Sequence, residues 1–375
     1  MSQAFDFQAL RRFPDVEADN LVAVDATDRL VLAEAGAAVR GADAGQVVVV
    51  GDRYGAMTLG VMALHGADDV RVHQDPLTGE QALTQNATRA GVNAGFRQLP
   101  LTPELFAGAA VVIGQLPKSL DALREIAQLA AAHADPGVQL FLGGRVKHMT
   151  HAMNDVLTDS FAEVRASLGV QKSRILMAQQ PRPDPKESTF PMRAFHADLD
   201  LWICAHGAAF AGTKLDLGTR LLLEFLDRMQ PAAVNAVDLG CGTGVIAAVL
   251  ARNRPQLDIL ATDLSSGAVS SALATMAANG LAERVRVLRD DAMSTLPDAS
   301  VDLIACNPPF HLGTSVDEGA AHKLFQAAGR VLRPGGQLWT VFNSHLDHRN
   351  QLNRSVGPTR VMGRNPKFTV TVSTR

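Results

Sequence analysis

Cysteine is scarce in this chain of 375 residues, and the three cysteines present show no CxxC or metal-type spacing. Cys204, Cys241 and Cys306 therefore argue against a disulfide scaffold and against a zinc site, and they are typical of a protein of the reducing cytosol. We expect no metal in this protein.

Long apolar runs are also missing. The first 20 residues lack the apolar core of a signal peptide, and no uncharged apolar stretch approaches the roughly 20 residues that a membrane helix needs. A net charge of −3 excludes a broadly basic, histone-like binder of nucleic acid, while 47% hydrophobic and 19% charged residues exclude intrinsic disorder. These absences predict a globular cytoplasmic protein without a membrane partner.

Prolines divide the chain into two parts of similar length. Four of them (Pro181, Pro183, Pro185 and Pro191) make the surrounding segment a poor helix or central strand, because each fixes φ and removes a backbone donor. We expect a domain at 1–180, a linker at 181–190 and a second domain at 191–375. Both parts alternate apolar strand-like runs with helical stretches, which predicts doubly wound α/β domains with mostly parallel sheets.

The second half shows this alternation clearly. We expect strands at 236–239, 258–262, 284–289 and 301–306, helices at 245–253, 267–279 and 320–332, and a late pair of strands at 337–342 and 368–374. The first half repeats the skeleton more weakly. Aligning Gly55 with Gly244 places Val49 on Asp238 and Gln74 on Asp263, so the polar loop residues differ. We interpret the first half as a duplicated domain whose site has been lost.

The strongest local signal is the segment Asp238-Leu239-Gly240-Cys241-Gly242-Thr243-Gly244. A strand enters glycines at alternate positions and then a helix, so a ligand can approach the backbone closely. The spacing is GxGxG, not the GxGxxG of dinucleotide sites, and an acid before it would repel a pyrophosphate. That acid, Asp238, suits a ligand with a cationic amino acid portion.

Two more acids end the next two strands. Asp263 is placed to accept hydrogen bonds from ribose hydroxyls, and Asp291 is placed to reach an adenine amino group. Its neighbour Ala292 is counted with the same pocket. Three acids at successive strand ends beside a glycine loop predict an S-adenosylmethionine site.

The fourth strand ends in Asn307-Pro308-Pro309-Phe310, which we assign to the acceptor site. The prolines stiffen the turn, so that the Asn307 side chain and the Pro308 carbonyl can accept hydrogen bonds from an exocyclic amine. Such acceptors orient a weakly nucleophilic nitrogen for attack on a methyl group, mainly through positioning and electrostatics. Phe310 offers a flat face on which an extruded base can stack.

These motifs, with a late Arg333-Pro334-Gly335-Gly336, resemble class I methyltransferases that modify amino nitrogens. Residues 210–220 are similar to the segment that precedes the cofactor domain in bacterial ribosomal RNA guanine-N2 methyltransferases. The resemblance implies two tandem Rossmann-like methyltransferase domains, each with a seven-stranded sheet, of which only the C-terminal one binds cofactor. Residues 10–14, 116–118 and 344–347 favour the large-subunit (23S) member over the small-subunit (16S) member.

The resemblance also implies roles for individual residues. Asn307 and Phe310 would contact the target base, and the Lys214–Thr219 segment would close over cofactor and base. The implied cofactor residues are Asp238, Gly240, Gly242, Gly244, Asp263, Asp291, Ala292, Lys214, Asp216, Gly218 and Thr219. One departure is the segment His206–Phe210, which differs from the usual Pro-Gly-Val-Phe.

Contact with ribosomal RNA needs local positive charge. Residues 342–375 carry six basic side chains against one acid, and Lys214 and Arg220 extend this candidate surface. A second, weaker candidate in the first half is formed by Lys118, Arg145, Lys147 and His148. Naked RNA and an assembling subunit both stay open as substrates.

Two alternative functions stay open. An amino-methyltransferase for protein glutamine or for adenine would use the same NPP[FY] motif, although the α/β first half speaks against the glutamine-modifying family. A non-catalytic RNA-binding or assembly module is a second alternative, against which the intact Asn307–Phe310 motif argues.

Overall fold

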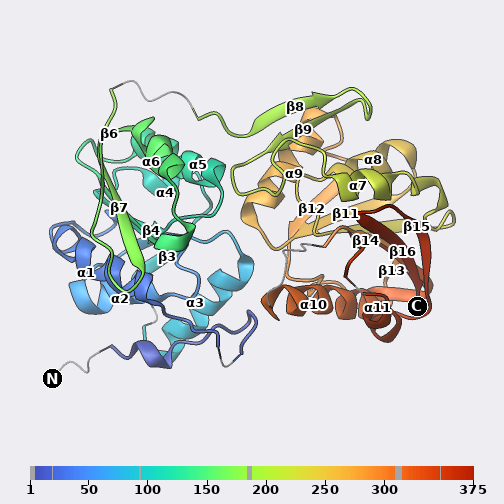
Figure 1. Cartoon of the computed structure of the whole chain (residues 1–375), viewed down its shortest axis with the longest axis horizontal. Coiled ribbons are helices and arrows are strands. Elements are labelled where there is room, and N and C mark those ends of the chain that lie inside the picture. The colour runs from blue at the N-terminus through green and yellow to red at the C-terminus, as the bar shows by residue number, and fades with distance from the viewer. Residues whose placement is uncertain (1–4, 19, 93, 184–187, 309–314, 347) are drawn as a thin grey trace. The chain divides into compact units, whose positions relative to one another are not determined.

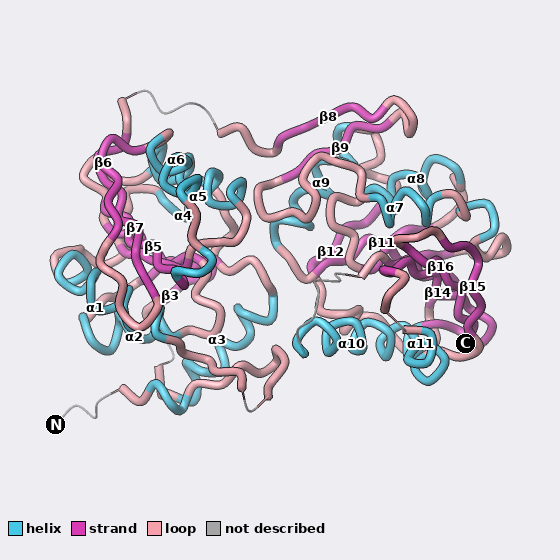
Figure 2. The backbone as a smooth tube through the Cα atoms, in the orientation of Figure 1, coloured by secondary structure: helices cyan, strands magenta, loops and turns pink. Residues whose placement is uncertain are grey.

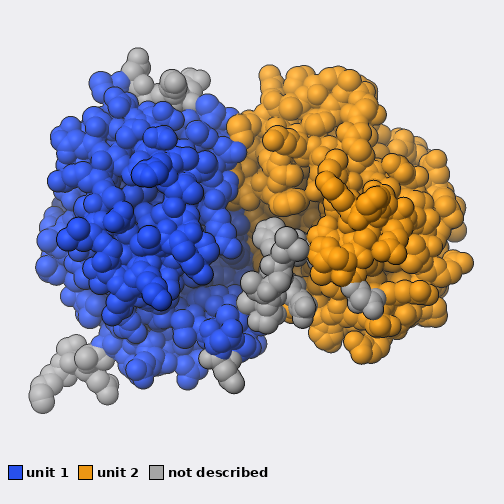
Figure 3. All heavy atoms as spheres, in the orientation of Figure 1, with its two compact units in different colours: residues 1–190 blue, residues 191–375 orange. Residues whose placement is uncertain are grey.

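The computed structural model describes residues 5–18, 20–92, 94–183, 188–308, 315–346 and 348–375. The described chain forms two compact units, Met1–Phe190 and Pro191–Arg375 (Figures 1 and 3). Each unit contains one sheet of seven strands with helices packed against it (Figure 2). The expected doubly wound, mostly parallel fold with seven strands in each half is confirmed.

In the first unit the strand order is β3-β2-β1-β4-β5-β7-β6. The pairings are parallel except for those of β7, which runs antiparallel to both β5 and β6. The strands are β1 (Val47–Val50), β2 (Val70–His73), β3 (Phe96–Gln98), β4 (Val111–Gln115), β5 (Gln139–Arg145), β6 (Phe161–Ala166) and β7 (Ser173–Pro181). The helices are α1 (Ala26–Arg40), α2 (Ala56–His65), α3 (Leu77–Arg89), α4 (Pro103–Phe106), α5 (Leu120–His133) and α6 (His151–Thr158), with 3-10 turns at Phe7–Ala9 and Val146–His148.

The second unit has the corresponding order, β12-β11-β10-β13-β14-β16-β15. Its strands are β10 (Asn235–Leu239), β11 (Asp258–Asp263), β12 (Val285–Arg289), β13 (Val301–Cys306), β14 (Leu332–Asn343), β15 (Thr359–Arg364) and β16 (Phe368–Thr374). Its helices are α7 (Leu217–Leu223), α8 (Val245–Asn253), α9 (Ser266–Ala278), α10 (Ser315–Val331) and α11 (Arg349–Ser355), with a 3-10 turn at Leu226–Arg228. A separate hairpin of β8 (Met192–His196) and β9 (Leu201–Ala205) precedes them.

Both sheets are covered on both faces, which explains why their central strands are continuous apolar runs. In β10, Ala236 packs into the core on one face of the sheet, and Val237 and Leu239 pack into the core on the opposite face. Successive side chains of a strand point to opposite faces. The same alternation in β1 distributes Val47 and Val49 to one core and Val48 and Val50 to the other. Burial on both faces therefore fixes the position of the carboxyl ends of these strands at one edge of the sheet.

The strand register supports the alignment of the two halves. Val50 pairs with Gly114 and with His73, and Leu239 pairs with Cys306 and with Thr262, so equivalent residues occupy equivalent places. The glycine loops also share a backbone path. Gly240, Gly242 and Gly244 have φ of 71°, 54° and 77°, and their counterparts Gly51, Arg53 and Gly55 have φ of 66°, 63° and 95°.

The region expected to be a linker begins inside a strand. Pro181 is the last residue of β7 and pairs with Phe161 of β6. A proline is tolerated there because it stands at the strand end, where one missing donor costs little. The first compact unit extends to Phe190 and thus includes the segment that we expected to be a linker.

Candidate functional site

The glycine loop joins β10 to α8, and its three glycines all adopt left-handed φ values that other residues avoid. A Cβ added to Gly240 or Gly242 would meet no other atom within 4 Å, so open space lies beside this part of the backbone. A Cβ on Gly244 would lie 2.9 Å from Met276 Cε and 3.1 Å from Ala272 Cβ. The first two glycines thus leave room for a ligand, whereas the third allows α8 and α9 to pack.

Asp238 is completely buried one residue before the end of β10. Its Oδ2 accepts a hydrogen bond of 2.9 Å from the backbone N–H of Ala247 in the first turn of α8. Its Oδ1 has no hydrogen-bond partner among the described residues. Burial raises the pKa of this carboxyl to about 7. A buried oxygen without a donor is a place where a ligand donor is favourable, so Asp238 fits the amino group of S-adenosylmethionine.

Asp263 connects the second strand to the glycine loop. Its Oδ2 accepts a hydrogen bond of 2.9 Å from the N–H of Gly242, and its Oδ1 accepts one of 2.9 Å from the N–H of Ser265. The structure therefore brings Asp263 and the loop together, as the expected pocket requires. A carboxylate oxygen can accept more than one hydrogen bond, so these two backbone bonds are compatible with a role of Asp263 toward ribose hydroxyls.

The two acids after β12 have different surroundings. Asp290 is buried and accepts hydrogen bonds from the backbone and hydroxyl groups of Ser294 and Thr295, which closes a turn. Asp291 instead forms an ion pair with Lys323 of α10. The following Ala292 and Met293 both have left-handed φ, 53° and 55°, so the chain reverses sharply here. Lys323 could not be found from the sequence because nothing local links it to Asp291.

Asn307 follows β13 and is held by the segment before α7. Its Nδ2 donates to Asp216 Oδ2 at 2.8 Å and to Thr219 Oγ1 at 2.9 Å. The same Asp216 oxygen caps α7 by accepting a hydrogen bond of 2.9 Å from the N–H of Thr219. With its nitrogen occupied, the Asn307 amide presents Oδ1, which receives no hydrogen bond from any described residue, as an acceptor.

Gly218 lies close to this group. A Cβ on Gly218 would lie 3.0 Å from Asp216 Oδ2, which is a tight contact, and 3.5 Å from Asn307 Oδ1, which is an ordinary one, so a larger residue would press on Asp216. Pro308 is buried, while Pro309 and Phe310 lie outside the described residues. Lys214 is exposed, and its backbone N–H donates to the carbonyl of Ala211 at 3.1 Å. The contacts therefore place Asp216 and Thr219 against Asn307, the residue that we expect at the acceptor site.

The structure also shows a connection that the sequence did not reveal. His196 at the end of β8 contacts the carbonyl of Thr213 through Nε2 at 2.7 Å. The hairpin is itself attached to α9, because Cys204 N–H donates to Thr275 Oγ1 at 3.0 Å. These bonds join the hairpin to the segment that carries Asp216.

The cysteines beside the loop do not provide a nucleophile. Cys241 and Cys306 are buried, and burial raises the pKa of each thiol well above its ordinary value. A thiol in such a place stays protonated, and only a thiolate is a strong nucleophile. Neither thiol is therefore suited to nucleophilic attack.

Within the described part of the chain, no helix has the length and apolarity to span a membrane. The same residues contain no group of three or more His, Cys, Asp or Glu side chains that could hold a metal ion.

Comparison with known proteins covers both units. Residues 1–182 match the family described as "RLMG N-terminal domain", and residues 200–372 match "Methyltransferase small domain". Among solved structures, a 16S rRNA N2 methyltransferase of T. thermophilus, in complex with AdoMet and guanosine, superposes with a TM-score of 0.71 at 20% identity. That match covers 91% of this chain and 92% of the other, and at this identity it shows that the two-unit fold is shared.

Curated relatives are closer in sequence. A protein of Streptomyces avermitilis named ribosomal RNA large subunit methyltransferase G is 33% identical, over 99% of this chain and 97% of the relative. A protein of Pseudomonas aeruginosa with the same name is 34% identical, over 96% of each chain. The chain thus belongs to the ribosomal RNA large subunit methyltransferase G family of S-adenosylmethionine-dependent enzymes.

Proposed function

We propose that this protein transfers a methyl group from S-adenosylmethionine to the exocyclic N2 amine of a guanine in 23S ribosomal RNA. The observation that carries the proposal is the fixed Asn307 amide, whose nitrogen is bonded by Asp216 and Thr219 so that its oxygen is free to accept an N–H. The names of the full-length relatives favour the large-subunit RNA.

The donor fits the residues that the structure brings together. Asp238 would bind the amino group, Asp263 the ribose hydroxyls and Asp291 with Ala292 the adenine, beside the open backbone of Gly240 and Gly242. When bound, S-adenosylmethionine supplies an electrophilic methyl group on a positively charged sulfur. Carboxylates near this ligand attract its positive charge.

The acceptor amine needs orientation more than deprotonation. Its lone pair is delocalised into the guanine ring, and hydrogen bonds from its N–H groups to Asn307 Oδ1 and to the Pro308 carbonyl would direct that lone pair at the methyl group. The N–C bond forms as the S–C bond breaks, and the amine proton leaves afterwards to water. The gain comes from positioning and from acceptors aimed at the developing positive charge.

The target guanine must leave its stack before this geometry can be reached. We assign the stacking role to Phe310, on the strength of its place in the Asn307–Phe310 motif. Exposed basic side chains of the C-terminal part supply a surface for RNA phosphates: Arg349 and Arg354 on α11, Arg360 and Arg364 on β15, and Lys367 before β16. Arg375 differs from them because its guanidinium is bonded to the carbonyls of Arg330 and Leu332.

A ribosomal RNA substrate also implies that the enzyme works in the cytoplasm, on free RNA or on an assembling subunit. The test is transfer of a radiolabelled methyl group to protein-free 23S RNA, protein-free 16S RNA, assembled subunits and a protein extract, followed by nucleoside analysis. Label in N2-methylguanosine of 23S RNA supports the proposal. Label in 16S RNA would correct the subunit, and label only in protein would replace the proposal by a glutamine methyltransferase.

A matched control separates this enzyme from a contaminating activity. The Asn307→Ala variant is expected to lose transfer to every RNA while it still binds S-adenosylmethionine. Equal label in wild type and variant would show that Asn307 does not bind the amine that receives the methyl group.

A further inference from the structure

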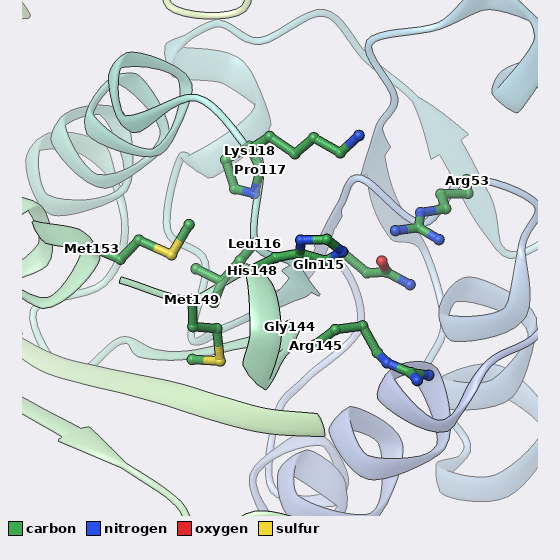
Figure 4. A pocket seen from close by; sticks show the side chains of 10 residues that line it. All are labelled: Arg53, Gln115, Leu116, Pro117, Lys118, Gly144, Arg145, His148, Met149 and Met153. Carbon is green, nitrogen blue, oxygen red and sulfur yellow. The ribbon is translucent and has the colours of Figure 1, made fainter. Parts of the chain in front are cut away.

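The first unit has a recess at the carboxyl ends of β1, β4 and β5. Its volume is about 60 Å³, and its lining includes three basic side chains, those of Arg53, Lys118 and Arg145. Figure 4 shows the charged ends of these side chains on one side of Gln115, with the sulfur atoms of Met149 and Met153 on the other.

This recess occupies the place that the methyl-transfer site has in the second unit. By strand register, Gln115 after Gly114 corresponds to Asn307 after Cys306. Arg53 corresponds to Gly242, and its φ of 63° matches the 54° of that glycine. The first unit has therefore kept the backbone path of a cofactor loop with an arginine at the position where a cofactor needs free space.

The acids at the two equivalent positions are missing here, and the loop keeps one buried acid, Asp52. The positions of the acids Asp238 and Asp263 are taken by Val49 and Gln74. Val49 is part of the core, and Gln74 is buried with its amide nitrogen bonded to the Gly79 carbonyl at 2.9 Å. The two acids that would bind a cationic donor are thus absent from these positions. Arg53, Lys118 and Arg145 line the recess instead.

Few acids compensate these cations. Arg53 is 3.9 Å from Asp25, and its side chain is 55% exposed. The Lys118 ammonium and the Arg145 guanidinium have no ion pair or hydrogen bond within the part of the chain that the structure describes. Asp28 lies behind the recess, where Gln115 Nε2 donates to it at 2.5 Å, and its burial disfavours the charged form. Lys118 and Arg145 thus lack a counter-charge among the described residues, and unpaired cations that line a recess attract an anion.

We propose that this recess binds a phosphate of the RNA backbone and does not bind S-adenosylmethionine. The proposal deepens the proposed function, on which the identity of the anion rests. Guanidinium groups from Arg53 and Arg145 match the geometry of phosphate oxygens, and Lys118 adds a point charge. The same cations oppose a sulfonium ligand, and the Arg53 side chain extends from the backbone position that is bare in Gly242.

The test measures RNA affinity against salt, using the full chain and a fluorescein-labelled uridine dodecamer. For single strands the slope of log Kobs against log salt becomes shallower by about 0.7 for each phosphate that the protein no longer neutralises. We expect this decrease in Arg145→Gln and in Arg53→Gly, and we expect Arg145→Lys to restore the wild-type slope. Arg53→Gly is a safe variant for folding because glycine accepts the left-handed backbone at this position.

Arg165→Gln is the matched control, since Arg165 is an exposed arginine on the edge strand β6, away from the recess. Equal slopes for wild type, Arg145→Gln, Arg53→Gly and the control would overturn the proposal. Equilibrium dialysis adds a second criterion. One S-adenosylmethionine per chain supports the proposal, and a second one that is lost in Arg145→Gln would overturn it.

The two proposals can fail separately. Dodecamer binding requires no methyl transfer, so a reduced slope in an enzyme that labels only protein would keep the phosphate site and reject the RNA methyltransferase. Conversely, unchanged slopes in an enzyme that methylates 23S RNA would reject only the recess. With methylation intact, the recess variants should show a raised KM for RNA and a kcat within about twofold of wild type.

Discussion

Replacing Asp216 with alanine should slow methyl transfer without weakening the binding of S-adenosylmethionine. In the structure one oxygen of Asp216 both caps α7, through Thr219 N–H, and fixes the amide of Asn307. Family resemblance groups Asp216 with the cofactor residues, so the experiment distinguishes two roles for one side chain. In the role we propose, Asp216 is a positioning residue that acts through Asn307.

The expected loss of kcat has two sources, rotation of the Asn307 amide and displacement of that amide from its place. A hydrogen bond to a charged group contributes about 1.5–3 kcal/mol, and the bond to Thr219 Oγ1 that remains contributes about 0.5–1.5 kcal/mol. That remaining bond still favours the correct orientation of the amide, so rotation alone can slow the reaction by no more than about twofold. Displacement of the Asn307 amide, which would hold the target amine, is the larger effect, and we expect kcat to fall by about 10- to 100-fold.

The assay is single-turnover methylation of 23S RNA with saturating donor, accompanied by calorimetric titration of S-adenosylmethionine. Loss of the cap should also destabilise the protein by about 0.5–2 kcal/mol, which thermal unfolding detects. Asp216→Asn is the control, because its amide oxygen can still accept both hydrogen bonds, and we expect it to retain most of kcat. A normal kcat together with a donor affinity weakened by about tenfold in Asp216→Ala would refute the positioning role.

Three other variants test the rest of the site. Asn307→Ala should abolish transfer and leave donor affinity within about twofold, because the acceptor loses its hydrogen-bond partner; full turnover in this variant would contradict the assignment. Asp263→Ala should weaken donor binding, since it removes the ribose acceptor and frees the N–H of Gly242; an unchanged dissociation constant would exclude Asp263. Asp238→Asn should remove a pH dependence of stability in the cofactor-free protein. Between pH 3.8 and 7 the folded state holds a proton that the unfolded state has lost, so wild-type stability falls as pH rises, by about 1.4 kcal/mol per pH unit from this group. The stability difference between variant and wild type in urea unfolding should therefore grow from about pH 4 to 7 and then level off, and a difference independent of pH would show that Asp238 titrates normally.

Much of the fold could be predicted because the decisive signals are local. The strand, glycine loop and helix between residues 235 and 253 agree with expectation to within one residue, since buried runs and left-handed glycines are visible in the sequence. The edge strand β15 and the short helices α7 and α11 were missed. Partly exposed edge strands and seven-residue helices carry little periodicity, and their stability comes from packing.

The site was predictable only as a set of strand ends. The order of the parallel strands places Asp238, Asp263 and Asn307 at one edge, and this much follows from alternation along the chain. The partners of these residues do not follow from it. Asp216 lies 91 residues from Asn307, and Lys323 lies 32 residues from Asp291, so only the folded chain shows that they are bonded.

One oxygen of Asp216 bonds both Thr219 in α7 and the Asn307 amide, so the order of this helix is linked to the orientation of Asn307. α7 has seven residues and would be unstable in isolation, so its first turn can open far more readily than the sheet beneath it. When that turn opens, Thr219 N–H is released and Asn307 loses the charged group that orients it. Opening of this helix turn and loosening of the Asn307 amide are therefore coupled, and hydrogen exchange at the Thr219 amide should report how often that loosening occurs.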